Sequence, residues 1–89
     1  MNKEKYWNPN VNDEIIGTFV EKIENVGEYK STLYKIQNDD EIINVWGKKQ
    51  LDSLMELVNI GDKIILRYVG TEKVNDYQMK KFELEIVNE

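Results

Sequence analysis

The sequence predicts a small all-β protein, a five-stranded β-barrel with one short helix between its third and fourth strands. Five stretches show the two-residue apolar alternation of strands, and a stretch between the third and fourth shows the helical period. The 89 residues, 40% hydrophobic and 33% charged, are typical of one globular domain. Because one short helix cannot cover both faces of a flat sheet, the strands are expected to curl into a barrel.

The chain is divided into an N-terminal arm, residues 1–13, and a domain, residues 14–89. The arm is expected to be mobile or loosely docked. Apolar alternation over residues 15–20 indicates the first strand, which starts at Glu14. Gly17 inside this strand predicts a bend or bulge, which a small barrel needs in order to close.

The second and third strands are predicted at Lys30–Gln37 and Glu41–Trp46, and the polar residues 38–40 join them in a hairpin. Ile43 and Val45 share one face of the third strand and suit the core. The opposite face therefore carries Ile42, Asn44 and Trp46. This parity predicts an outward-facing tryptophan.

The helical period follows directly, and it ends at the turn signal of residues 59–62. The apolar stripe of this helix contains Leu51, Leu54, Met55 and Val58. The fourth strand is predicted from Ile64 to Gly70, residues 71–76 as a polar loop, and Tyr77–Val87 as the fifth strand. Tyr68 and Phe82 match the parity of core residues.

The composition argues against catalysis and gives no reason to expect a cofactor or a metal. Cysteine and histidine are absent, which excludes disulfides, thiolate nucleophiles, the usual zinc sites and a histidine general base. Asp13 and Glu14 are adjacent on a strand, so their carboxylates point to opposite faces. The acidic segment 38–41 lacks calcium-loop spacing and is interpreted as a solvated hairpin turn.

The charge distribution bears on the partner. The net charge of −5 opposes nucleic-acid binding, which normally requires a basic surface. Between Lys63 and Phe82, however, five basic residues stand against two acidic ones, and the acidity lies mainly in the helix and at the chain ends. No apolar run reaches the roughly 20 residues that cross a bilayer, and the N-terminal residues lack the apolar region of a signal peptide. A cytoplasmic protein without membrane contact is expected.

Nearly all of the chain after Asp13 resembles a known family. The most specific features are Trp46-Gly47 before a short helix and the sequence Gly-Asp-Lys at the start of the fourth strand. The similar stretches are residues 15–20, 29–36, 45–51, 58–70 and 81–86. The chain resembles the short single-stranded DNA-binding proteins of phages that have an oligonucleotide-binding (OB) fold. More distantly, it resembles the OB domains of archaeal replication protein A.

The resemblance implies an OB-fold protein that binds single-stranded DNA in replication, recombination or repair, inside a bacterial host if phage-encoded. In such proteins the ligand crosses the second and third strands between two flanking loops. Carried over residue by residue, the binding residues are Tyr29, Lys30, Leu33, Lys35, Asn44, Trp46, Lys48 and Lys49, with Arg67, Lys73 and Tyr77 at the edges. Tyr34 is a further candidate, although its strand parity also fits the core.

The segment 46–49 supplies both groups that single-strand binding needs. An aromatic face stacks a base, which is worth about 1–3 kcal/mol, and cationic side chains follow the phosphates. Lys48 and Lys49 also open a helix, where the macrodipole disfavours positive charge and an anion would relieve it. The alternative is that Trp46 packs under the helix and both lysines are merely solvated. For Tyr29 and Tyr77, stacking and ordinary surface placement both remain open.

Two other functions remain open. The acidic balance would favour an OB module that binds a protein, and nothing in the sequence separates RNA from DNA. Replication or recombination proteins are further expected partners, and both a monomer and a homodimer fit the sequence.

Overall fold

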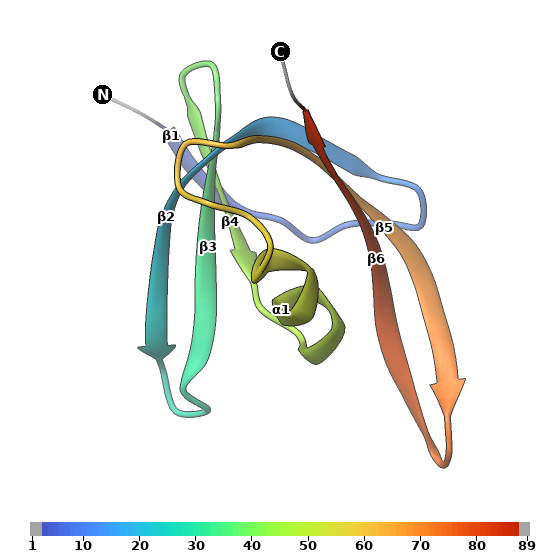
Figure 1. Ribbon diagram of the computed structural model, residues 1–89. Helices are drawn as coiled ribbons and strands as arrows, with labels where there is room; N and C mark the ends of the chain where they lie inside the picture. The colour runs from blue at the N-terminus through green and yellow to red at the C-terminus, as the bar shows by residue number, and fades with distance from the viewer. Residues whose placement is uncertain (1–2, 88–89) are drawn as a thin grey trace.

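The computed structural model describes residues 3–87 and confirms a small, compact all-β protein with one short helix (Figure 1). Residues 1, 2, 88 and 89, the outer ends of the predicted arm and domain, lie outside the described residues. The elements are β1 (Lys3–Tyr6), β2 (Glu14–Val26), β3 (Ser31–Asn38), β4 (Glu41–Trp46), α1 (Lys49–Met55), β5 (Lys63–Val74) and β6 (Tyr77–Val87). No helix within the described part of the chain is long and apolar enough to cross a membrane.

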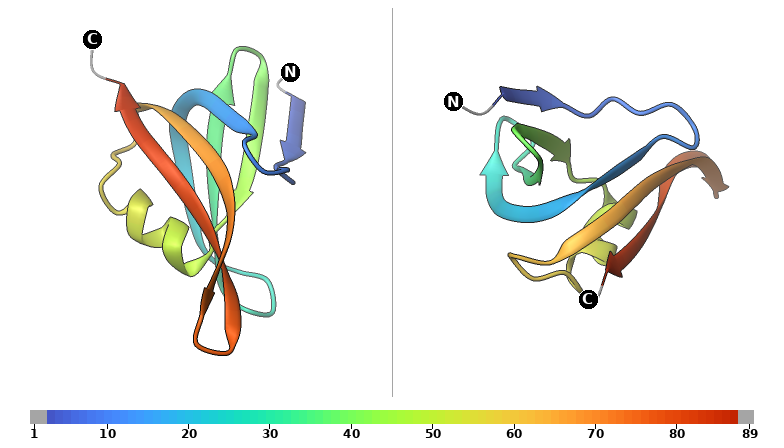
Figure 2. Two further views of the ribbon diagram at one scale, coloured as in Figure 1. Left: turned by 90° about the vertical axis from the view of Figure 1, so that its right-hand side faces the viewer. Right: turned by 90° about the horizontal axis from the view of Figure 1, so that it is seen from above.

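The strands form one six-stranded sheet in the order β1-β4-β3-β2-β5-β6. β1 pairs with β4 in parallel, and all other neighbours are antiparallel. The sheet ends in β1 and β6 and is open, whereas a closed five-stranded barrel was predicted. It curves strongly, so that α1 lies inside its concave side (Figure 1 and Figure 2).

The additional strand lies in the predicted arm. The edge of β4 would otherwise present unpaired backbone N–H and C=O groups. Lys3–Tyr6 satisfies that edge in register with residues 41–44. This part of the arm is therefore ordered in the sheet, although its sequence has no apolar alternation that would announce a strand.

The polar loop predicted at residues 71–76 is instead the end of a long hairpin. β5 continues to Val74, which is paired with Tyr77, and only Asn75 and Asp76 form the turn. Asn75 has a φ of 56°, a conformation that asparagine tolerates in tight hairpin turns. The end of the hairpin extends past the other strands of the sheet (Figure 1), and most of its residues are exposed. Residues 71–74 and 77–80 therefore form strands although their sequence lacks the apolar alternation of a strand with one buried face.

The core lies between the concave face of the sheet and α1. Leu51 and Met55 of the helix pack there against buried side chains of β2 to β6. Ile43, Val45, Tyr68 and Phe82 are all buried, as their strand parity predicted. The predicted irregularity near Gly17 lies further along β2, where the register with β3 shifts between Phe19 and Glu21.

Candidate nucleic-acid interface

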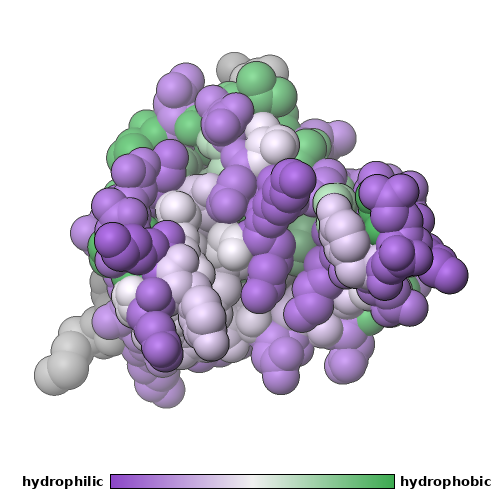
Figure 3. Space-filling view, turned by 90° about the horizontal axis from the view of Figure 1, so that it is seen from below, coloured by the Kyte–Doolittle hydropathy of each residue, from purple (hydrophilic) through white to green (hydrophobic). Residues whose placement is uncertain are grey.

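Two hairpin tips and the start of α1 lie at the same end of the molecule. The β2–β3 turn and the β5–β6 hairpin both project from the lower end in Figure 1, with α1 between them. Seen from below, this face is hollowed between the two projections. Hydrophilic side chains rim it, and paler ones lie between them (Figure 3). Six residues that the sequence nominated belong to these three segments: Tyr29, Lys30, Lys48, Lys49, Lys73 and Tyr77.

A cleft of about 320 Å³ lies between the start of α1 and the β5–β6 hairpin. It is lined by Lys48, Lys49, Tyr77, Gln78, Met79 and Lys80. The structure thus brings together three residues that the sequence predicted separately, Lys48, Lys49 and Tyr77. Within residues 3–87, no carboxylate lines the cleft. Three ammonium groups beside an aromatic ring and a methionine can accept an anion that also carries a flat, apolar part.

Sequence reasoning missed Met79 and Lys80. Treating Asn75-Asp76 as a two-residue turn would have found them, because the hairpin then extends down to Val74 and Tyr77. Met79 and Lys80 would then have been placed close to the tip of the hairpin, on the strand that follows the turn.

Ion pairing separates the predicted cations into two groups. Lys35 lies 2.6 Å from a Glu4 carboxylate oxygen, and the side chain of Arg67 contacts both Glu14 and Glu83. The hydrogen bonds from Arg67 to Glu14 raise the pKa of the guanidinium above its ordinary value. Both cations are paired with carboxylates of the same chain in this conformation, so neither is free to contact a phosphate unless its ion pair opens. Four predicted lysines have no ion pair within residues 3–87: Lys30, Lys48, Lys49 and Lys73.

The aromatic candidates are exposed to different extents. Tyr29, in the β2–β3 turn, is 88% exposed, and Tyr77 is 52% exposed. Trp46 lies outside the buried core, as the parity of β4 predicted, and is 37% exposed. Its ring stacks on Tyr6 of β1, with ring centroids 5.9 Å apart and an angle of 17° between the planes. Tyr6 therefore covers part of the stacking surface.

Three predicted binding residues are buried and cannot contact a ligand in this conformation. Tyr34 belongs to the core, where its hydroxyl donates a hydrogen bond to Asp52. Leu33 shares the outward parity of Trp46 but is only 5% exposed.

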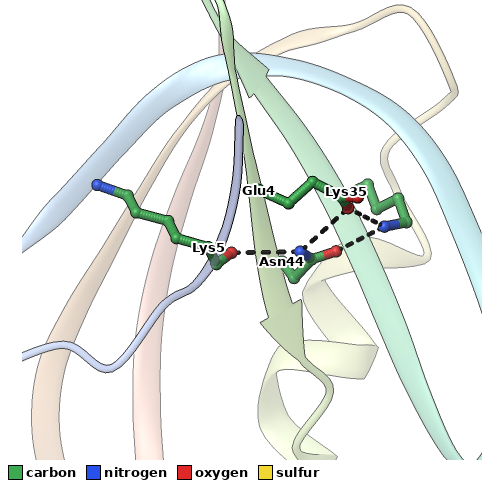
Figure 4. A network of polar contacts seen from close by, with 4 residues as sticks. All are labelled: Glu4, Lys5, Lys35 and Asn44. Atoms are coloured by element: carbon green, nitrogen blue, oxygen red, sulfur yellow. Dashed lines mark hydrogen bonds and ion pairs between the residues drawn. The ribbon is translucent and has the colours of Figure 1, made fainter. Parts of the chain in front are cut away.

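Asn44 is 1% exposed, and it contacts β1, the neighbouring strand in the sheet. Its amide nitrogen donates to the Lys5 carbonyl at 3.2 Å and to the Glu4 carboxylate at 3.4 Å, and its amide oxygen accepts from Lys35 (Figure 4). The side chains of Glu4 and Tyr6 thus reach from the neighbouring strand onto the β3–β4 outer face, where the resemblance places the ligand. The hydrogen bond from Lys35 lowers the pKa of the Glu4 carboxyl, so these contacts favour the ionised carboxylate.

The described part of the chain contains no group of three or more metal-ligating side chains arranged around one point. Comparisons of the chain with protein-family models, with curated proteins and with solved structures gave no match.

Proposed function

We propose that this chain is a non-catalytic single-stranded DNA-binding protein with an OB-type fold. Support for the fold comes from the order strand, strand, strand, helix, strand, strand of β2 to β6 with α1. Their arrangement β4-β3-β2-β5-β6, with every neighbour antiparallel, agrees with this topology. In this proposal β1 occupies the edge of β4 that would otherwise be available to close the barrel.

The observation that carries the proposal is the cleft lined by Lys48, Lys49, Lys80 and Tyr77, to which the described part of the chain contributes no carboxylate. In a chain of net charge −5, three lysines around one cleft, none of them with an ion pair to another described residue, are a local exception to the overall charge. Lysines that face solvent without a partner contribute little to folding. They attract an anion, and the released counterions make that attraction depend on salt.

The proposed ligand path runs across the lower end of the molecule. The phosphate backbone passes the cleft lysines, with Lys30 and Lys73 at the two projecting hairpins. Bases stack on Tyr77 and Tyr29, the two exposed rings at the hairpin tips. Stacking on open rings reads no base edge, so the protein is expected to bind strands of any sequence and protect them during replication, recombination or repair.

Titration with oligo(dT) tests the proposal, with the binding of a labelled strand followed by fluorescence anisotropy at several salt concentrations. The affinity should fall as salt rises. The double variant Lys48→Ala/Lys49→Ala should flatten the slope of log affinity against log salt by about one or two. The matched control is Lys22→Ala/Lys63→Ala, which makes the same charge change outside the cleft and should keep the slope. An equal slope in the two double variants would remove phosphate contact from the cleft.

A second candidate function is protein binding at the open edge of β6. The Gln50 side chain accepts a hydrogen bond from the Phe82 N–H at 2.8 Å and donates one to the Phe82 carbonyl at 3.3 Å. The amide thus imitates one residue of a neighbouring strand, at the free end of the sheet. A partner strand could pair along the same edge. If oligo(dT) gives no binding at low salt, this function replaces DNA binding. The same titration with oligo(U) separates RNA from DNA.

A further inference from the structure

β1 presents two chemical groups to the β3–β4 hairpin, and both resemble parts of a nucleic acid. The Glu4 carboxylate accepts a hydrogen bond from Lys35 at 2.6 Å and a longer one from Asn44 at 3.4 Å. The Tyr6 ring stacks on Trp46. Figure 4 shows the first of these contacts, with Glu4, Lys35 and Asn44 converging beside the strand.

The groups that receive β1 suit single-stranded DNA equally well. A phosphate oxygen accepts the same hydrogen bonds from an ammonium and an amide as the Glu4 carboxylate does. A base stacks on an indole as the Tyr6 ring does. Glu4 and Tyr6 are two residues apart on a strand, so their side chains share one face. β1 thus places an anion and a flat ring together on Lys35, Asn44 and Trp46.

The attachment of β1 is weak enough to be reversed. All four of its residues are exposed, and among the described strands it pairs with β4 alone. Two of its side chains form ion pairs, Lys5 with Glu41 and Glu4 with Lys35. The Lys5 and Glu4 side chains are 59% and 54% exposed, so neither pair is shielded from solvent. The following residue, Trp7, is held more firmly, because its N–H donates to the Asn44 carbonyl at 2.8 Å and its ring packs against Phe82. Trp7 can therefore act as the anchor about which β1 lifts.

We infer that β1 is a built-in competitor that masks a second single-strand-binding surface, formed by Lys35, Asn44 and Trp46. This inference rests on the proposed function. Trp46 is followed directly by Gly47 and the two cleft lysines, so the masked surface continues the cleft along β4. A DNA strand bound in the cleft displaces β1 and extends onto the part of the β3–β4 outer face that the Glu4 and Tyr6 side chains had covered. Affinity for short strands is then set partly by the equilibrium between docked and lifted β1.

Weakening β1 tests the direction of this effect. Glu4→Gln removes the anion, and the affinity for oligo(dT) should rise by about two- to fivefold, the range for loss of one exposed ion pair. Tyr6→Ala uncovers Trp46 and should raise the affinity as well. The control Glu85→Gln makes the same charge change on β6, at the opposite end of the sheet, and accounts for net charge alone. An affinity that falls in Tyr6→Ala would make Tyr6 a ligand contact and overturn the inference.

A disulfide that locks β1 gives an independent test. Lys3 and Glu41 are partners across the β1–β4 pair, and the described chain has no cysteine of its own. In Lys3→Cys/Glu41→Cys the oxidised protein should bind oligo(dT) about fivefold or more weakly than the reduced protein, the loss of one stacked base. Equal affinities of the two forms would show that β1 need not move. That result would leave the proposed function standing, whereas absence of binding in both forms and in Glu4→Gln would refute the function itself.

Discussion

The Tyr34 hydroxyl donates a hydrogen bond of 2.6 Å to Asp52, which joins the middle of β3 to the first turn of α1. Burial, together with this bond to a carboxylate, raises the pKa of the phenol above its usual value of 10.0. The bond also explains Gly47, since a Cβ at that position would collide with the Asp52 carboxylate and approach the Thr32 carbonyl to 3.1 Å. The segment between β4 and α1 is shaped around this contact.

Tyr34→Phe should therefore destabilise the protein without weakening binding by the folded molecule. Loss of a hydrogen bond to a charged acceptor is expected to cost about 1.5–3 kcal/mol of unfolding free energy. Urea denaturation measures the loss, and oligo(dT) titration of the folded variant checks the affinity. Tyr77→Phe serves as the control for stability, because Tyr77 is exposed. A variant of unchanged stability but reduced affinity would return Tyr34 to the binding surface.

Two adjacent lysines offer a matched comparison for the cleft. Lys80 lines the cleft, whereas Lys81 lies 2.9 Å from a Glu72 carboxylate oxygen. Lys80→Ala should reduce the salt slope of oligo(dT) binding by about one, because one phosphate contact is lost. Lys81→Ala makes the same charge change and should leave the slope unchanged. Equal effects of the two substitutions would mean that only net charge matters, and the cleft would lose its role.

Trp46→Ala is expected to weaken binding strongly while the fold survives. The ring is 37% exposed and lies outside the core cluster, so its removal opens no internal cavity. Loss of one stacked base should cost about 1–3 kcal/mol of binding free energy. Anisotropy of a labelled oligonucleotide measures this loss without relying on the removed fluorophore. Leu57→Ala, at a 73% exposed apolar side chain, is the control. Failure of Trp46→Ala to fold would place the indole among the structural residues instead.

Gly17 is required by the close approach of β3 to β2. A Cβ at this position would lie 2.5 Å from the Gln37 carbonyl oxygen and 2.9 Å from a methyl carbon of Ile36. Gly17→Ala should therefore destabilise the protein by about 1–3 kcal/mol, the usual cost of overpacking. Gly27→Asn is a contrasting change in the β2–β3 turn, where the space is open and asparagine tolerates the φ of 76°. Thermal unfolding of both variants distinguishes a packing requirement from a general need for glycine.

The sequence alone was sufficient for features set by local periodicity. β4 and β6 have the predicted bounds, and Val45 and Phe82 lie in the core because strand parity determines the face of each side chain. Trp46 points outward for the same reason.

Features set by strand register over long distances could not be predicted. Arg67 looked available in the sequence, but pairing of β2 with β5 puts it opposite Glu14, 53 residues away. β1 has four polar or amphipathic residues without periodicity, and only the unpaired edge of β4 makes them a strand. The burial of Asn44 follows from that pairing.

Acidification should release β1 through Glu4. The hydrogen bond from Lys35 lowers the pKa of this carboxyl below its ordinary value of 4.5, so docking of β1 favours the ionised form. The stability that this contact gives to docked β1 is present above pH 4.5 and is lost as the pH falls through the lowered pKa. NMR titration of the Glu4 side chain, with the amide exchange of Lys5 and Tyr6, should show β1 loosening at acid pH before the core unfolds. Lys35→Met should bring the Glu4 pKa back toward 4.5. A Glu4 pKa that is unchanged by this substitution would show that Lys35 does not hold β1 in place, and the masking of Trp46 would then depend on the Tyr6 ring alone.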